Sequence, residues 1–357
     1  MKGGLALYSL QTILYWPGRG IPAGKGKIES GMTARSPYDT LVTVYGGSGF
    51  LGRHVVRALA KRNYRIRVAV RRPELAGFLQ PLGRVGQIHA VQANVRHAAS
   101  VETAARDAQV LINLVGILFE RGRQRFDAVH TYGAEQVALG ANAHGARMVH
   151  VSAIGADANS SSAYGRSKAK AEQLVLAAQP SAAIMRPSIL FGPEDDFFNR
   201  FAALARISPA LPLIGGGLTR FQPVFVGDVA SAIADAVDGK VRSGTIYELG
   251  GPDVLTFKEL MQFVLTTIER KRLLLSLPFF MARLQSTLLQ YFPKPMLTPD
   301  QVELLRNDNV VSPSAKAELR TLQGLGIEPE PIEAIVPSYL WRFRKTGQFR
   351  KRWTIPR

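Results

Sequence analysis

Apolar residues in this chain alternate between short continuous runs and segments in which they recur every three or four positions. The run 41–45 ends at glycines, and apolar residues at helical spacing follow it, which predicts a strand, a tight turn and a helix. Further runs typical of strands are 65–70, 88–92, 110–115, 147–152 and 182–185, with helical segments between most of them. This alternation predicts parallel strands joined by right-handed crossovers, and therefore an α/β fold with a doubly wound, Rossmann-type sheet.

The alternation of strand-like and helix-like segments ends after Arg186, Pro187 and Ser188. Prolines and a run of three glycines divide the following chain into short pieces, with amphipathic helices expected near 229–237 and 257–268. We expect a nucleotide-binding domain at 39–190 and a smaller C-terminal α/β lobe at 191–337. Some strands in the range of the lobe could pair with the main sheet. Residues 1–38 are expected to be a leader or a disordered arm, since Met32 resembles a natural start.

The segment 273–292 is strongly apolar, but Pro278, Arg283, Gln285 and Gln290 interrupt it. A membrane-spanning helix needs about 20 predominantly apolar residues without such breaks. The pattern therefore predicts a buried or interfacial amphipathic helix, and no transmembrane span.

A glycine-rich turn joins the first strand to the first helix and consists of Gly46, Gly47, Ser48, Gly49, Phe50, Leu51 and Gly52. Its glycines satisfy the GxGxxG spacing. The pyrophosphate of a dinucleotide must meet backbone N–H groups at a helix N-terminus, and residues without a Cβ let the backbone approach it. Glycines also close ordinary loops, but the strand before this turn and the helix after it favour a dinucleotide site.

The second strand ends at Arg71 and Arg72. An acidic residue at this position binds the ribose 2′-hydroxyl of NAD, whereas an arginine accommodates the 2′-phosphate of NADP. We therefore expect NADP(H), with NAD(H) as the second choice. The alternative is that the two arginines form a solvated basic turn.

Tyr164 and Lys168 form a YxxxK motif at the start of a predicted helix, which places them one turn apart on the same face. A lysine ammonium stabilises a nearby phenolate, so the tyrosine can exchange a proton with a substrate hydroxyl or carbonyl. Ser152, at the end of the preceding strand, is placed to hydrogen-bond the same oxygen. We expect Ser152, Tyr164 and Lys168 to be the catalytic group of any reaction, although each residue alone has common structural uses.

These motifs together resemble the extended and atypical branches of the short-chain dehydrogenase/reductase superfamily, over residues 41 to about 336. The resemblance rests on the glycine loop, Tyr164 with Lys168, and three further segments: Asn94 and Val95, Val115 and Gly116, and Arg186 to Gly192. It implies that Asn94, Val95, Val115 and Gly116 lie along the adenosine and ribose of the cofactor. It further implies that Arg186 and Pro187 lead to its nicotinamide side.

Within that superfamily, the segments 42–53, 113–116 and 186–195 are similar to the nucleotide-binding accessory subunit of respiratory complex I (alpha-subcomplex subunit nine) and its bacterial homologues. This resemblance implies a tightly bound NADPH in a structural or assembly component of a membrane-associated NADH:ubiquinone oxidoreductase. Asn94 departs from the aspartate of many relatives at the adenine contact. The second hypothesis is an active NADP-dependent reductase, epimerase or dehydratase that uses Tyr164 and Lys168.

The formal net charge is +18, and seven of the cations lie in 338–357, where there is no carboxylate. Aromatic residues alternate with these cations, which is typical of a tail that docks on an acidic membrane surface or on acidic subunits of a respiratory complex. The alternative is a disordered, solvated tail. No element for base readout accompanies the charge, so we predict no nucleic-acid partner. We expect a cytoplasmic protein peripheral to the inner face of the bacterial inner membrane, or to the matrix side in a eukaryote.

The chain has no cysteine, which excludes disulfides, thiolate nucleophiles and cysteine-ligated metals. Its six histidines show no metal-ligand spacing. We therefore predict no metal site.

Overall fold

The computed structural model describes residues 36–290, 295 and 297–347. Most of the expected N-terminal arm and the end of the expected basic tail lie outside the described residues.

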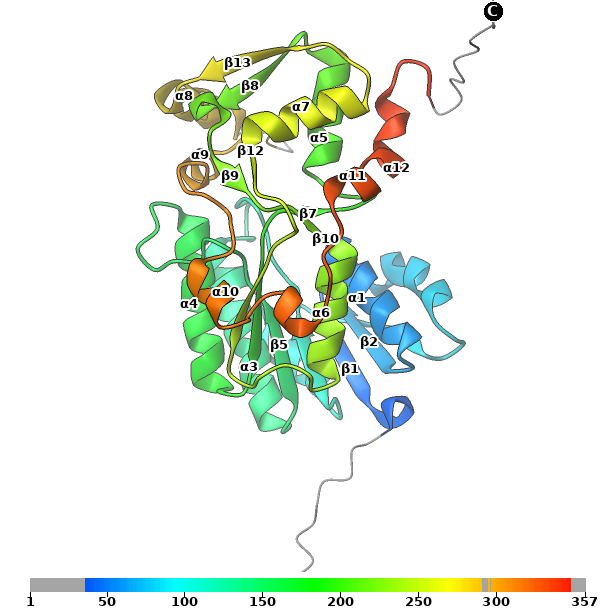
Figure 1. Ribbon diagram of the computed structural model, residues 1–357. Helices are drawn as coiled ribbons and strands as arrows, with labels where there is room; N and C mark the ends of the chain where they lie inside the picture. Colours follow the sequence, from blue (N-terminus) through cyan, green and yellow to red (C-terminus); the bar gives the residue numbers. More distant parts are fainter. Residues whose placement is uncertain (1–35, 291–294, 296, 348–357) are drawn as a thin grey trace, which may run out of the picture. The chain divides into compact units, whose positions relative to one another are not determined.

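A parallel sheet forms the centre of the N-terminal part of the described chain (Figure 1). Its strand order is β11-β6-β5-β4-β1-β2-β3. The strands are β1 (Leu41–Tyr45), β2 (Arg65–Val70), β3 (Ile88–Gln92), β4 (Val110–Asn113), β5 (Arg147–Val151), β6 (Ala183–Pro187) and β11 (Ile246–Leu249). The predicted doubly wound sheet is confirmed, because the order reverses between β1 and β4 as in Rossmann folds.

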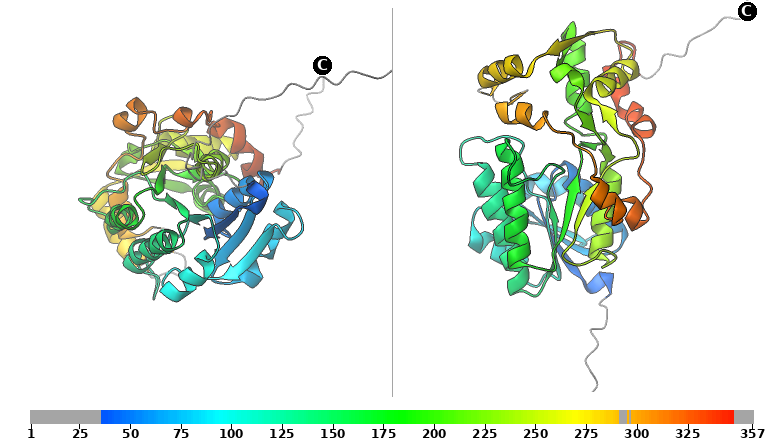
Figure 2. Two further views of the ribbon diagram at one scale, coloured as in Figure 1. Left: turned by 90° about the horizontal axis from the view of Figure 1, so that it is seen from below. Right: turned by 60° about the vertical axis from the view of Figure 1, so that its left-hand side comes forward.

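Helices cover both faces of this sheet, which is why its strands read as continuous apolar runs rather than alternating ones. One face carries α1 (Phe50–Lys61), α6 (Val226–Val237) and the 3-10 segment η2 (Pro73–Leu82). The other face carries α2 (Ala98–Ala105), α3 (Tyr132–Ala143) and α4 (Ala163–Ala178). In the right-hand view of Figure 2 the sheet lies between the green helix α4 and the yellow-green helix α6.

Strand β11 belongs to the main sheet although it lies more than 50 residues after β6 in the chain. It pairs in parallel with β6, with Ile246 opposite Ile184 and Leu249 opposite Pro187. The chain therefore leaves the sheet after β6, forms part of the C-terminal lobe, and returns through α6 and β11 before it completes the lobe.

The C-terminal lobe combines short helices with two-stranded ribbons. Its longer helices are α5 (Phe198–Ile207), α7 (Phe257–Thr267) and α8 (Phe279–Leu289), and its short ones are α9 (Pro299–Leu304), α11 (Ile332–Ile335) and α12 (Pro337–Leu340). The short helix α10 (Pro313–Ala317) lies beside the main sheet instead, where the N–H of Ser312 donates to the carboxylate of Glu248 in β11 at 2.7 Å (Figure 1). The ribbons pair β7 (Leu190–Phe191) with β10 (Val224–Phe225), β9 (Arg220–Phe221) with β12 (Leu255–Thr256), and β8 (Ala210–Ile214) with β13 (Leu273–Leu277). Phenylalanines from α5, α7 and β7 pack edge to face at the centre of the lobe.

The prediction of one amphipathic helix over 273–292 was wrong in its first half. Residues Leu273–Leu277 form β13, which pairs in parallel with β8, and α8 begins only after Pro278. Proline disfavours helical backbone at the preceding residue, and an adjacent strand was available as a partner. No helix of the described residues is long and apolar enough to cross a membrane.

The first part of the expected basic tail packs on the lobe. Tyr339, Leu340 and Phe343 are buried in the lobe core. The Arg342 guanidinium donates to Asn199 Oδ1 at 2.6 Å, and Arg344 Nε donates to the carbonyl oxygen of Thr267 at 2.9 Å. Up to residue 344, the segment therefore contributes to the fold of the lobe.

Candidate nucleotide-binding site

The glycine-rich turn is tightly closed at the N-terminus of α1. Gly46 has a φ of +82°, which glycine adopts without strain, and its carbonyl oxygen accepts a 3.0 Å hydrogen bond from the N–H of Gly49. A Cβ added at Gly52 would lie 2.3 Å from that carbonyl oxygen. The first turn of α1 can therefore approach the strand end only because Gly52 has no side chain.

An open pocket lies beside this turn, among the loops that follow β1, β2, β3 and β4. Nine of the residues that line it belong to segments singled out from the sequence: Gly46, Ser48, Gly49, Arg71, Asn94, Val95, Leu114, Val115 and Gly116. Ligands of doubly wound sheets bind in this crevice, beyond the carboxyl ends of the strands. Gly47, Phe50, Leu51 and Gly52 support the turn from behind and do not line the pocket.

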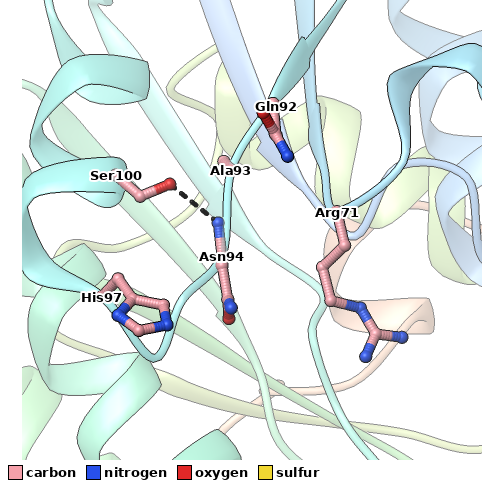
Figure 3. Close-up of a pocket in the computed structure, with 6 residues that line it drawn as sticks. All are labelled: Arg71, Gln92, Ala93, Asn94, His97 and Ser100. Atoms are coloured by element: carbon pink, nitrogen blue, oxygen red, sulfur yellow. Dashed lines mark hydrogen bonds between the residues drawn. The ribbon is translucent and has the colours of Figure 1, made fainter.

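The pocket continues into a second hollow between the ends of β2 and β3. Figure 3 shows Arg71 on one side of this hollow and Asn94 with His97 on the other. The N–H of Asn94 donates to Ser100 Oγ at 2.9 Å, which fixes the loop after β3. Arg72 is exposed and lines neither hollow, so Arg71 alone of the two predicted arginines faces the site.

Several residues of these hollows were not identified from the sequence, namely Arg96, His97, Ser100, Ile117, Gln124 and Val129. Arg96 Nη1 donates to the carbonyl oxygen of Arg123 at 3.0 Å and so connects the loops after β3 and β4. Some of these residues could have been suspected because they follow the end of a strand. Hydrophobic periodicity does not predict where a loop side chain points, because that depends on the turns of the loop.

Tyr164 and Lys168 lie on one face of α4, as the YxxxK spacing predicts. Ser162 caps the helix, and Lys168 Nζ lies 5.9 Å from the centroid of the Tyr164 ring. Lys168 Nζ also donates to the carbonyl oxygen of Val151 at 3.2 Å. Burial lowers the pKa of the Lys168 ammonium to about 8, against the opposing effect of Glu172. Burial, with a further contribution from the charge of Asp300, raises the pKa of the Tyr164 phenol to about 12.

Ser152 is buried at the carboxyl end of β5, and its hydroxyl has no hydrogen-bond partner among the described residues. An unpaired buried hydroxyl costs free energy unless a ligand or a water satisfies it. Ser152 itself lines neither of the two hollows.

Gly116 connects the pocket to Tyr164 and Lys168. A Cβ added at Gly116 would lie 3.6 Å from Lys168 Nζ and 3.7 Å from His130 Nε2. The backbone of Gly116 also lines the open pocket. A dinucleotide whose adenosine lies near Arg71 and Asn94 would therefore pass Gly116 on its way to Lys168.

His130 was not identified from the sequence, and it holds two sides of the site together. It lies in a π-helical turn, Asp127–Thr131, a conformation found often at functional sites. Its Nε2 accepts a 2.9 Å hydrogen bond from the N–H of Ile117, so the ring proton resides on Nδ1, which lies 2.9 Å from Ser167 Oγ. Burial, followed by the charge of Lys168, lowers the pKa of His130 to about 2. A neutral His130 therefore connects the loop after β4 to α4.

Arg186 and Pro187 lie at the end of β6 and do not line either hollow. Arg186 Nε donates to Glu172 Oε1 at 2.8 Å, and the guanidinium also lies 3.7 Å from Glu248. The carbonyl oxygen of Pro187 accepts from the N–H of Ile154 at 3.0 Å. In this structure Arg186 thus links β6, α4 and β11.

No cluster of three or more histidine or carboxylate side chains suited to a metal ion occurs in the part of the chain that the structure describes. The residues of the pocket instead fit a dinucleotide, because the closed glycine turn at the N-terminus of α1 borders the crevice at the strand ends. Ser152 lines neither hollow.

Comparison with known proteins agrees with this assignment. Residues 42–250 match the NAD dependent epimerase/dehydratase family. The mitochondrial NADH dehydrogenase (ubiquinone) 1 alpha subcomplex subunit 9 of Arabidopsis thaliana is 36% identical over 331 residues, which cover 89% of this chain and 81% of that protein. A ceramide reductase of Caulobacter vibrioides is also 36% identical, but over 193 residues, or 54% of this chain and 59% of that protein.

Among solved structures, the dTDP-glucose 4,6-dehydratase of Bacillus anthracis in complex with NAD has a similar fold. Its TM-score is 0.63 at 18% identity, over 84% of this chain and 95% of that one. The fold, the glycine turn and the length of the sequence match thus lead to one conclusion: this chain belongs to the NAD-dependent epimerase/dehydratase family, in the branch that contains the alpha-subcomplex subunit 9 proteins.

Proposed function

We propose that this chain is an NAD(P)(H)-binding accessory or assembly protein of a membrane-associated NADH:ubiquinone oxidoreductase, and that its nucleotide has a structural role. The observation that carries the proposal is the extent of similarity to the alpha-subcomplex subunit 9 of Arabidopsis thaliana, which includes the C-terminal lobe as well as the sheet. The similarity to the ceramide reductase covers only about half of the chain.

The chemistry of Tyr164 supports a binding role. A phenol with a pKa of about 12 is a poor proton acceptor near neutral pH, because a general base works best when its pKa lies near the ambient pH. Burial and then the charge of Asp300 both act against the phenolate. In this role the nucleotide stabilises the folded chain through binding, by mass action.

We propose NADP(H) as the preferred nucleotide, with NAD(H) second. Arg71 lines the hollow between β2 and β3, together with the side chains of His97 and Ser100. A guanidinium with neighbouring hydrogen-bond donors suits a 2′-phosphate, whereas preference for NAD requires a carboxylate in this place. The first carboxylate after β2 is Glu74, on the exposed 3-10 segment.

The alternative function is an active NADP-dependent reductase, epimerase or dehydratase. The unpaired hydroxyl of Ser152 favours it, since that group is free to hydrogen-bond a substrate oxygen. Tyr164 would then donate a proton to that oxygen, and Lys168 would hold the ribose side of the site with its ammonium. The bound nicotinamide would supply the hydride.

We propose that subunits of the respiratory complex, or the acidic membrane surface beside them, are the partners of the basic C-terminal residues. This places the protein at the inner face of a bacterial inner membrane, or at the matrix side in a eukaryote. Because Tyr339, Leu340 and Phe343 belong to the lobe core, a deletion that tests the tail should start after Lys345. Loss of membrane association in the chain without residues 346–357 would support tail docking, and unaltered fractionation would oppose it.

The central experiment is purification of the native protein from membranes, followed by mass spectrometry of its bound nucleotide and of its associated proteins. We expect NADPH to be retained through gel filtration and respiratory-complex subunits to co-purify. Recovery of a nucleotide-free protein without these subunits, with turnover of a carbonyl substrate that Tyr164→Phe abolishes, would instead establish the alternative.

A further inference from the structure

Large apolar residues are exposed on β13 and α8, two elements that lie at one edge of the C-terminal lobe (Figure 1). We call this surface the α8 face; it consists of the exposed residues Leu273, Leu275, Phe280, Met281, Leu284 and Leu288. Phe280, Leu284 and Leu288 are 73%, 70% and 69% exposed. Grouped exposure of this kind marks an interaction site more often than isolated exposed leucines do.

Helix α8 is oriented with its small residues toward the protein. Ala282 and Ser286 are its buried residues, and Ala282 packs with Ile214 and Val302. Phe280, Leu284 and Leu288 recur every four positions and therefore form one stripe along the helix. A surface helix normally buries its large apolar stripe against the core. Here the stripe faces outward, and it is not part of the packed core of the lobe.

Cations predominate along the segment that forms the α8 face. From Arg270 to Gln290 the chain has four cations, Arg270, Lys271, Arg272 and Arg283, and no aspartate or glutamate. Lys271 and Arg283 are exposed. Arg283 has an ion-pair partner, Glu303 of α9, at 3.7 Å, but its side chain remains 67% exposed. An apolar stripe flanked by cations is the arrangement that binds the interface of an anionic bilayer.

We propose that the α8 face docks on an anionic lipid bilayer, with Phe280, Leu284 and Leu288 among the acyl chains and Lys271 and Arg283 at the headgroups. This inference rests on the proposed membrane-associated function and adds to it the surface that contacts lipid. The α8 face does not include the basic C-terminal residues. The C-terminal segment passes beside Arg270, whose Nε donates to the carbonyl oxygen of Phe343 at 3.0 Å. The α8 helix would lie in the plane of the interface and would not cross the bilayer.

The test is co-sedimentation of the full-length chain, purified with its nucleotide, with vesicles of phosphatidylcholine alone and of phosphatidylcholine mixed with phosphatidylglycerol. We expect binding to the mixed vesicles only. The variant F280S/L284S/L288S should bind the mixed vesicles at least about tenfold more weakly than the unaltered chain. The matched control L75S/V85S/L139S changes three other exposed apolar residues and should bind like the unaltered chain. Both variants should retain the thermal midpoint and the nucleotide, because none of these side chains is buried.

Equal binding by the two triple variants would overturn the proposal, and so would the absence of binding to mixed vesicles. If F280S/L284S/L288S binds vesicles normally but no longer co-purifies with respiratory subunits, the face is a protein interface instead. Nucleotide retention and co-purification are measured separately, so a failure of lipid docking is distinct from a failure of the proposed function.

Discussion

The carboxylate of Asp300 accepts a 2.6 Å hydrogen bond from the backbone N–H of Ala163, 137 residues earlier in the chain. It also accepts a 2.8 Å hydrogen bond from the hydroxyl of Ser162 and a longer one from the N–H of Tyr164. Negative charge at a helix N-terminus is stabilising, because the first N–H groups have no partner within the helix. The C-terminal lobe therefore secures the helix that carries Tyr164 and Lys168.

Replacement of Asp300 tests this connection. Asp300→Ala should reduce the free energy of unfolding by about 1–3 kcal/mol, because it removes the acceptor for several N–H and O–H groups. Asp300→Asn should cost less and should lower the pKa of Tyr164, while burial keeps that pKa above the ordinary value. Urea unfolding measures the first effect, and absorbance titration of D300N against D300N/Y164F measures the second. An unchanged Tyr164 pKa in D300N would contradict the proposed electrostatic effect.

Gly52 and Gly77 provide a contrast between a required and a replaceable glycine. Gly52→Ala should destabilise the chain by several kcal/mol and abolish nucleotide binding, because its Cβ would overlap the carbonyl oxygen of Gly46. Gly77→Ala is the control, since a Cβ there would meet no atom within 4 Å. Thermal unfolding and calorimetry with NADPH measure the two effects. Near-native affinity in G52A would show that the turn can open without consequence.

Arg71 and Arg72 should differ in their effect on nucleotide preference. Arg71→Asp should weaken NADPH binding about 10- to 100-fold and bring its affinity near that of NADH, because a charge-assisted hydrogen bond contributes about 1.5–3 kcal/mol. Arg72→Asp makes the same charge change outside the hollows and should have a much smaller effect. Calorimetric titration with both nucleotides decides the matter. If R71D and R72D behave alike, general electrostatics rather than a 2′-phosphate contact sets the preference.

The buried histidines should make the fold sensitive to mild acid. Burial and the charge of Lys168 lower the pKa of His130 to about 2 and that of His150 to about 3, well below the value of about 6.5 in an unfolded chain. The unfolded chain therefore takes up these protons first, so the contribution of the two histidines to stability is complete above pH 6.5 and decreases as the pH falls. The pKa of Asp228, which burial raises to about 6, acts in the opposite direction below that pH. Each histidine should contribute a loss of about 1.4 kcal/mol per pH unit until its folded-state pKa is reached.

Urea unfolding at pH 7 and pH 5 tests this expectation. The variant His130→Gln should lose roughly half of the difference between the two conditions, whereas His89→Gln, at an exposed position, should keep it. A pH dependence that begins only in the range of carboxylate titration, near pH 4, would contradict a neutral His130 in the folded chain.

The parts of the fold that were predictable from the sequence are those in which neighbours in the chain are neighbours in space. The strand, glycine turn and helix from Leu41 to Lys61 follow from local apolar spacing, and so does β3 at its observed limits. Tyr164 and Lys168 were found because four residues make one helical turn. Periodicity could not separate β13 from α8, because a short apolar run fits either a strand or a buried helix.

The remaining features of the site could not be predicted, because they depend on contacts between segments that are distant in the sequence. His130 contacts Ser167 of α4 from a π-helical turn, and Asp300 reaches α4 from a short helix of the lobe. Arg186 matches a family motif, but the partners that hold it, Glu172 and Glu248, come from α4 and β11. Such pairings depend on tertiary structure, which local patterns do not encode.

The return of the chain through α6 and β11 has a consequence for how the protein can be divided. A fragment ended at residue 190 would lack the strand that pairs with β6 and the helix that packs on α1. It would expose the backbone of β6 as a sheet edge. It would also expose the apolar surface that α6 covers, and both features promote self-association. The glycine turn would be present in such a fragment, but the fragment should aggregate rather than bind nucleotide. Expression of the nucleotide-binding part therefore requires β11 and also the segment near Arg320, whose carbonyl oxygen accepts from the N–H of Glu248 and which precedes the core residue Leu322.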